Sequence, residues 1–240
     1  ALAVADDLGA ILIIAIFYTG TVVLANLLIS LGIFAVLILL NRLKVHNLIP
    51  YVAGGIAMWY FMHHSGVHAT ITGVLLAFAL PFGNGGEKSP SYLLQHWLHK
   101  PVAFIILPVF ALANTSIPIS SDWYSGLMQP LSLGIMAGLV LGKPLGILFF
   151  SYSAVSLRLC TLPPELNWKH ITGIGLLAGI GFTMSIFITI LAFSSEELIN
   201  DAKIAILVAS LIAGISGFIW LWITLGKQFS RMHERVKPEG

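Results

Sequence analysis

Three ionisable side chains stand inside otherwise apolar stretches of the sequence, namely Asp6, Asp7 and Lys143. A charge near the centre of a bilayer costs on the order of 2.5–3.5 kcal/mol on insertion scales, so such groups usually face a water-filled cavity or one another and mark the path of an ion. Consecutive positions of a helix differ by about 100°, so Asp6 and Asp7 cannot point the same way, although both can border one wide cavity. This combination predicts ion binding or ion transport.

Each of these residues also has a purely structural interpretation. If the protein began at residue 1, Asp6 and Asp7 could form a helix N-terminus at the membrane surface, where acidic side chains suit the helix dipole. Lys143 could extend along its helix and bring its ammonium group to the interface. Pro144 follows it directly and loosens the helix by removing a backbone donor. A buried lysine prefers a carboxylate partner, and Asp6 and Asp7 are the candidates within the apolar sequence.

A glycine-rich stretch covers residues 173–185. Its members are Gly173, Gly175, Gly179 and Gly181, followed by Phe182, Thr183, Met184 and Ser185. Glycines at this density permit close packing of two helices, which is common in membranes. They also permit an interrupted helix, which transporters place at the midplane, where the ends of half-helices meet ions.

Several histidines offer further chemistry. His64 and His68 have the i, i+4 spacing of helical metal ligands, with His63 adjacent, but the sequence gives no third ligand at a matching spacing. An intramembrane metal enzyme is therefore a weak alternative. His96 and His99 precede an apolar stretch, and histidine is the side chain most often used to sense pH near neutrality, so they are candidates for a response to pH. Neither a phosphate-binding glycine loop nor a nucleophile elbow accompanies them.

The composition determines which class of protein carries these residues. Of 240 residues, 58% are hydrophobic and 9% charged, the net charge is +2, and the mean hydropathy is +0.94. These values exclude a disordered chain, a soluble enzyme with a solvated surface and a nucleic-acid binder. The single cysteine, Cys160, excludes an intrachain disulfide. The apolar runs are too long and too continuous for an alternating β-barrel, so the sequence predicts an all-α integral membrane protein.

Turn residues and charges divide the chain into about eight membrane spans within a single membrane domain over residues 1–240. The predicted spans cover residues 1–18, 22–40, 48–62, 66–81, 101–117, 127–157, 171–193 and 204–225. An amphipathic stretch at 92–100 is predicted at the membrane interface. The chain opens in apolar sequence without an initiator Met, so we expect it to be a C-terminal portion of a longer protein.

The basic residues distribute unequally across this layout. Ten of them fall on one side, namely Arg42, Lys44, Lys88, Lys100, Arg158, Lys169, Lys227, Arg231, Arg235 and Lys237. The other side has only Lys203, beside Glu196, Glu197 and Asp201. Because basic loops stay in the cytoplasm, the C-terminal tail is predicted to be cytoplasmic.

Five motifs resemble the NhaA family of sodium/proton antiporters. They are Leu-Ala-Val-Ala-Asp-Asp-Leu-Gly-Ala at 2–10, Ser-Gly-Val-His-Ala-Thr at 65–70, Leu-Pro-Val-Phe-Ala-Leu-Ala-Asn at 107–114, Leu-Gly-Lys-Pro-Leu-Gly at 141–146 and Gly-Ile-Gly-Phe-Thr-Met-Ser-Ile-Phe at 179–187. The motifs follow the order of the family and extend over essentially the whole chain. The resemblance implies the inverted-repeat antiporter fold, with its N-terminal part missing here.

The resemblance also implies roles for individual residues. Asp7 would be the main ligand of sodium and protons, with Asp6 beside it and Lys143 as the charge partner of Asp6. One of two crossed, interrupted helices would contain Gly179, Gly181, Thr183 and Met184. His68, His96 and His99 would take part in the response to pH. Gln95 stands where the family often has an acidic residue, so the alkaline activation profile could differ.

The function implied by the resemblance is exchange of sodium or lithium for protons across the bacterial inner membrane. It would be pH-regulated and electrogenic, it would need no cofactor, and it would not be enzymatic. The expected partners are the two ions, the lipid bilayer and a second copy of the chain, with no nucleic acid. Two alternatives stay open on the residues alone: a non-coupled cation channel, and the metal enzyme described above.

Overall fold

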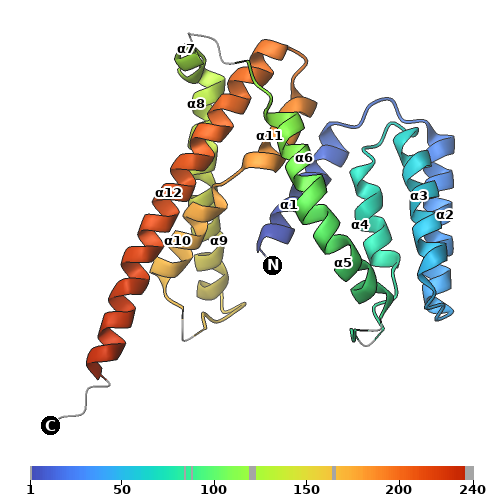
Figure 1. Cartoon of the computed structure of the whole chain (residues 1–240), viewed down its shortest axis with the longest axis horizontal. Helices are drawn as coiled ribbons and strands as arrows, with labels where there is room; N and C mark the ends of the chain where they lie inside the picture. Colours follow the sequence, from blue (N-terminus) through green and yellow to red (C-terminus); the bar gives the residue numbers. More distant parts are fainter. Residues whose placement is uncertain (1, 84, 88, 119–122, 164–165, 236–240) are drawn as a thin grey trace. The chain divides into compact units, whose positions relative to one another are not determined.

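The computed structural model describes residues 2–83, 85–87, 89–118, 123–163 and 166–235, and every regular element in these ranges is a helix. Two positions that entered the charge count, Lys88 and Lys237, lie outside the described residues. The chain divides into two compact units, residues 1–113 and 114–240, which are described separately. Figure 1 shows the helices with their labels.

Among its described residues the first unit contains six helical segments and most of a seventh. They are α1 (Leu2–Phe17), α2 (Leu24–Arg42), α3 (Leu48–His63), α4 (Thr70–Ala79), α5 (Pro90–Pro101), the π-helical turn η1 (Val102–Ile106) and α6 (Leu107–Thr115). Asn47 and Ser89 provide the N-caps of α3 and α5, because their side-chain oxygens accept hydrogen bonds from the amides of Ile49 and Tyr92. These caps explain why the helices begin where they do.

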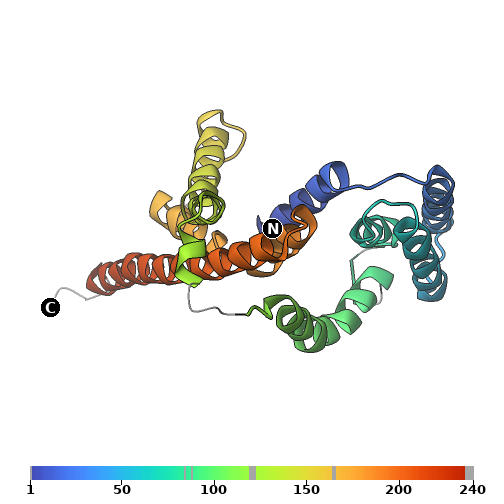
Figure 2. The ribbon, with the colours of Figure 1, turned by 90° about the horizontal axis from the view of Figure 1, so that it is seen from above.

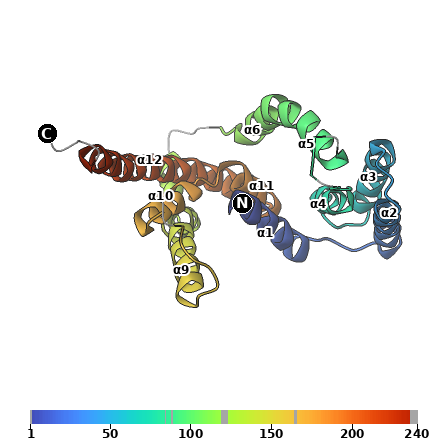
Figure 3. The same cartoon turned by 90° about the horizontal axis from the view of Figure 1, so that it is seen from below.

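The core of the first unit lies among α2, α3 and α4. Its buried members are Leu37, Tyr51, Ala79 and Leu80. Polar side chains of α2 also link the helices, because Ser30 donates to the carbonyl of Met58 (3.1 Å) and Asn41 donates to the carbonyl of Ala79 (3.0 Å). In lipid such carbonyls have no water to bind, so these hydrogen bonds join the helices. Figure 3 shows α2 and α3 side by side.

The second unit is organised around one long helix. Its segments are α7 (Trp123–Leu127), α8 (Pro130–Ala137), the π-helical turn η2 (Gly138–Gly142), α9 (Lys143–Ser156), α10 (Trp168–Ala178), α11 (Phe182–Ala192) and α12 (Glu196–Arg235). Helix α12 is continuous from end to end in Figure 2 and contacts α7, α8, η2, α10 and α11. The indole N–H of Trp220 on α12 donates to the carbonyl of Lys169 (2.9 Å), which fixes the start of α10 beside the C-terminal half of α12.

Both π-helical turns precede a proline by the same interval. The turn η1 ends two residues before Pro108, and η2 ends two residues before Pro144. Proline removes one backbone hydrogen bond and its ring presses on the preceding turn, so a locally widened helix relieves the clash. The loosening predicted at Pro144 therefore takes the form of a wider turn, and the helix continues through it.

The predicted spans can be compared with these helices. Within the described part of the chain, four continuous helical runs are long and apolar enough to cross a membrane: Leu24–Arg42, Pro90–Thr115, Pro130–Ser156 and Glu196–Leu225. The pair α10 and α11 would form a fifth span if it counts as one broken crossing. The stretch at 92–100, predicted as a separate interfacial segment, is instead continuous with the next span, because the helix continues through Pro101 into η1. Helices α1, α3 and α4 coincide with three further predicted spans, but with 16, 16 and 10 residues they are shorter than the four runs named above.

Candidate functional site

The predicted ion ligands Asp6 and Asp7 lie in the first half of α1. Both side chains are exposed. Ile14, seven positions after Asp7, is fully buried. Residues seven apart on a helix lie on nearly the same side, so Asp7 shares the stripe that buries Ile14, while Asp6 lies about 100° away. The two carboxylates therefore point in different directions, as their spacing predicts.

The helix predicted to be interrupted within residues 173–185 is broken at Gly179–Gly181. Helix α10 ends at Ala178, α11 begins at Phe182, and their axes are bent by 46°. The last turn of α10 is closed by two short-range hydrogen bonds, from the amide of Gly179 to the carbonyl of Leu176 (3.0 Å) and from the amide of Ile180 to that of Leu177 (3.1 Å). The break is thus a defined turn between two separate half-helices.

The start of α11 is capped from another helix. The N-cap position is Gly181, which has no side chain, and no local side chain replaces it. Instead the hydroxyl oxygen of Ser210 on α12 accepts hydrogen bonds from the amides of Gly181 and Phe182, both at 3.2 Å. Thr183 and Met184 follow in the first turn of α11 and are half-buried.

The glycines of the break are required by the close approach of η2. A methyl group at Gly179 would lie 2.5 Å from the carbonyl oxygen of Leu139 and 3.0 Å from the methyl group of Ala213. A methyl group at Gly181 would overlap the hydroxyl of Ser185 and lie 2.9 Å from the side chain of Leu139. The backbone of η2 therefore packs directly against the break.

Lys143 lies close to this region along its own helix. It is the first residue of α9, directly after η2, and its side chain is half-buried. The neighbouring Pro144 packs against Gly175 of α10, where a methyl group would lie 3.4 Å from the proline backbone. The second unit thus brings Lys143 and the broken helix together, whereas Asp6 and Asp7 belong to the first unit.

The predicted pH-responsive histidines lie in two different settings. His68 lies in the loop before α4, with its Nδ1 atom 3.0 Å from the hydroxyl of Thr70. His96 and His99 are exposed on α5, where the ring of His96 stacks on Tyr92.

The metal-enzyme alternative has no support in the described part of the chain. No group of three or more His, Cys, Asp or Glu side chains there could hold a metal ion. His64, one of its proposed ligands, uses its Nδ1 atom in a hydrogen bond with the carbonyl of Tyr60 (2.8 Å).

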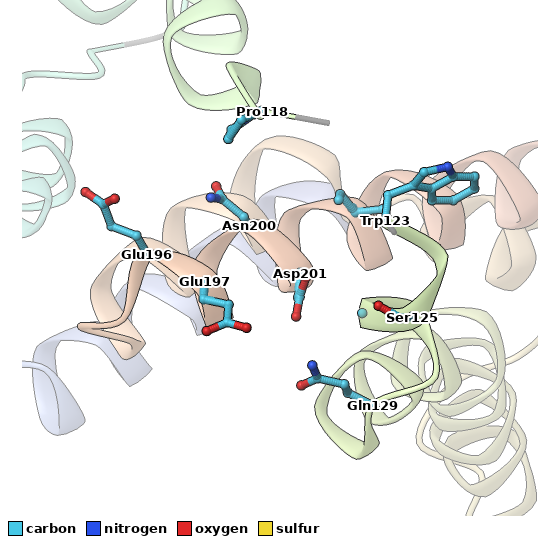
Figure 4. Close-up of a pocket in the computed structure, with 10 residues that line it drawn as sticks. Pro118, Trp123, Ser125, Gln129, Glu196, Glu197, Asn200 and Asp201 are labelled. Atoms are coloured by element: carbon cyan, nitrogen blue, oxygen red, sulfur yellow. The ribbon is translucent and has the colours of Figure 1, made fainter. Parts of the chain in front are cut away.

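An acidic pocket of about 610 Å³ lies at the start of α12. Figure 4 shows Glu197 and Asp201 facing Ser125 and Gln129 across it. The Asp201 carboxylate packs directly on Gly126 of α7. This acidic end of α12 lies far along the helix from Trp220, where the backbone of the basic residue Lys169 is bound.

Comparison with known proteins identifies the family to which this arrangement belongs. The family model described as Na+/H+ antiporter 1 matches residues 1–221. The chain belongs to this family. The resemblance to NhaA antiporters found in the motifs is therefore confirmed.

Individual relatives agree with this assignment. A protein of Flavobacterium psychrophilum named Na(+)/H(+) antiporter NhaA is 66% identical over 221 residues, which is 92% of this chain and 58% of that protein. Na(+)/H(+) antiporter NhaA 1 of Flavobacterium johnsoniae is 63% identical with the same coverage. Na(+)/H(+) antiporter NhaA of Cytophaga hutchinsonii is 58% identical over 230 residues, 96% of this chain and 59% of that protein. The chain therefore spans somewhat less than three fifths of the length of these NhaA relatives.

The sequence did not predict that Ser210 takes part in the break between α10 and α11. A serine in an apolar helix is its only sequence signal, and Ser30, Ser132 and Ser216 carry the same signal in other places. Its partners, the amides of Gly181 and Phe182, are 29 and 28 positions away, so only the packing of α11 on α12 identifies it.

Proposed function

We propose that this chain is part of a secondary transporter that exchanges sodium or lithium ions for protons across the bacterial inner membrane. The observation that carries the proposal is the broken helix α10–α11, held against η2 beside Lys143, in a chain of the Na+/H+ antiporter 1 family. Broken helices place polar backbone ends at membrane depth, where transporters bind ions. The names of the close relatives support the choice of sodium and protons.

The proposed chemistry is competition for carboxylate oxygens. Asp7 is the main ligand and Asp6 assists it. Hard cations prefer oxygen ligands, and a proton bound to the same oxygens excludes them. As the pH rises the proton leaves and sodium enters. Lys143 neutralises Asp6 in one state and releases it in another, and alternating exposure of the site to the two sides of the membrane turns this competition into exchange.

Several further properties belong to the same proposal. Transport is electrogenic, with more protons than sodium ions moved per cycle, and it is regulated by pH through His68, His96 and His99. No resident cofactor takes part and no bond of a substrate is broken, so the protein is a transporter and not an enzyme. The fold is the inverted-repeat antiporter fold with about eight spans in this chain, arranged as a single membrane domain.

The orientation and assembly are proposed from charge and family. Lys169, the second residue of α10, is bound through its carbonyl by Trp220 in the C-terminal half of α12, and Arg158 lies between α9 and α10. Glu196, Glu197 and Asp201 lie at the other end of α12. This polarity supports a cytoplasmic C-terminus. A homodimer in the inner membrane is the proposed assembly.

Replacement of Asp7 by Asn tests the proposal directly. In everted membrane vesicles containing the complete protein, addition of sodium should dissipate an imposed ΔpH, and Asp7→Asn should reduce this response to the background of vesicles without the protein. Asn keeps the shape but loses the charge that binds sodium. Asp201→Asn, at the acidic pocket of α12, should leave the response intact. Full exchange in Asp7→Asn would overturn the assignment, and sodium flux without any proton movement would identify a channel.

The same vesicles test the role of Lys143. Lys143→Ala should shift the pH profile of exchange or lower the thermal stability, because Asp6 loses its cationic partner. The control is Lys169→Ala, since Lys169 is exposed and contributes only its carbonyl to Trp220. A Lys143→Ala protein with an unchanged melting curve and pH profile would remove the proposed ion pair.

A further inference from the structure

The break between α10 and α11 leaves backbone donors that the local sequence does not satisfy. The first amides of any helix lack partners within that helix, and in soluble proteins a Ser, Thr, Asp or Asn at the N-cap accepts from them. Helix α11 has Gly181 at this position and no side-chain cap. At membrane depth no bulk water replaces the missing acceptor, and an unsatisfied amide costs several kcal/mol.

Ser210 provides the missing acceptor from α12. Its hydroxyl oxygen has two lone pairs, and the amides of Gly181 and Phe182 each donate to it at 3.2 Å. With both lone pairs engaged, this oxygen has none left to coordinate a cation. Ser210 is therefore suited to hold the break in position and not to bind sodium itself.

The other hydroxyl described in this part of α12 behaves differently. Ser216 donates to the carbonyl of Ala213 at 3.1 Å, within its own helix. Such back-bonding is the common use of serine inside a helix and links no second element. Ser210 thus makes hydrogen bonds between two helices, whereas Ser216 makes one within its own helix.

We infer that Ser210 is a positioning residue of the transport site, which caps α11 from α12 and fixes the geometry of the break at Gly179–Gly181. This inference rests on the proposed function. The N-terminal end of α11 is the positive end of its dipole, and a bound hydroxyl oxygen partly screens it. Without the oxygen, two bare N–H groups would repel a cation near the break.

The experiment compares variants of Ser210 that differ in whether they keep the hydroxyl group. Ser210→Thr and Ser210→Val have nearly the same shape, so any steric cost is common to both, and only Thr keeps the hydroxyl. Ser210→Ala removes the hydroxyl without adding volume, and Ser216→Ala is the matched control. All are made in the complete protein, and amide hydrogen exchange of residues 180–185 and sodium-dependent proton movement are measured on each.

The hydroxyl should control both measurements. In Ser210→Ala and Ser210→Val, residues 180–185 should exchange faster, because two hydrogen bonds are lost. The apparent KM for sodium should rise about tenfold, the lower range for the loss of two hydrogen bonds, with a smaller change in maximal rate. Ser210→Thr should exchange more slowly than Ser210→Val and recover most of the sodium affinity, and Ser216→Ala should match the unmodified protein.

Different results would contradict the cap, its positioning role and the proposed function. If residues 180–185 exchange equally in Ser210→Thr and Ser210→Val, and at the unmodified rate in Ser210→Ala, the cap is overturned whatever the transport result. If the cap affects exchange but the KM for sodium is the same in the Thr and Val variants, the positioning role is overturned. If the unmodified protein moves no protons on addition of sodium, the proposed function fails, while hydrogen exchange still decides the cap.

Discussion

Two glycine-rich segments of this chain have opposite outcomes. In α3 the adjacent Gly54 and Gly55 lie inside an unbroken helix, whereas Gly179 and Gly181 lie at the break between α10 and α11. In α3 the glycines make room for side chains: methyl groups there would meet Leu37 of α2 and Leu76 of α4. At the break a methyl group on Gly179 would meet the carbonyl oxygen of Leu139.

The difference lies in what the neighbours provide. At Gly54 and Gly55 the neighbours are the apolar side chains of Leu37 and Leu76, so the helical hydrogen bonds remain the best available for the backbone there. Around the break, α12 provides a hydroxyl that replaces the missing acceptor for two amides. Glycine density permits both outcomes, and the polar groups of the packed neighbours decide between them.

The largest expected effect is that of an alanine substitution at the break, compared with the same substitution in α3. Gly179→Ala should lower sodium-dependent proton movement at least about tenfold and destabilise the protein by about 3 kcal/mol, the upper range for overpacking, because the new methyl group meets backbone that cannot rotate away. Gly54→Ala meets the end of the Leu37 side chain, which can shift, and gains helix propensity, so it should cost clearly less than Gly179→Ala in stability and leave transport largely intact. Equal effects of the two substitutions on transport and melting temperature would end the distinction.

A third role of glycine is to adopt a left-handed backbone conformation. Substitution at such a position should have an intermediate effect on stability. Gly66 has a φ of +84°, and a methyl group there would overlap the carbonyl oxygen of Thr21. This loop also accepts hydrogen bonds from the amides of Gly20 (3.2 Å) and Val23 (2.9 Å) through the carbonyls of Gly66 and Ser65. Gly66→Ala should therefore destabilise the chain by about 1–3 kcal/mol, measured as a lower melting temperature.

Gly73 supplies the control for Gly66. It lies inside α4, and a methyl group there would meet nothing within 4 Å. Gly73→Ala should leave the melting temperature unchanged or raise it, since alanine favours a helix by about 0.5–1 kcal/mol over glycine. A Gly66→Ala protein that melts together with Gly73→Ala would show that the left-handed conformation and the contact with Thr21 carry no cost.

The sequence predicted the apolar helices and the break because their signals are local. Apolar runs located the helices to within a few residues in most cases, and four glycines within nine residues located the break. The sequence could not predict Ser210 as the cap, because its partners are almost thirty positions away. The continuation of α5 through Pro101 was also missed, since a π-helical turn has no sequence signal beyond the proline itself.

The smallest expected effect concerns the other half-helix, which caps itself. Asn167 Oδ1 accepts from the amide of His170 (3.0 Å), and the amide of Asn167 donates to His170 Nδ1 (3.4 Å), so α10 begins with a reciprocal capping box. His170→Ala loses one of these bonds but also removes the buried Nε2 atom, which has no partner among the described residues. The free energy of unfolding should therefore fall by less than the about 1 kcal/mol of a lost cap, seen as a small fall in melting temperature. His170→Gln, which keeps a side-chain acceptor, should recover it. Because this cap is local, hydrogen exchange of residues 180–185 should stay at the unmodified rate, and faster exchange there would mean that the two half-helices are not held independently.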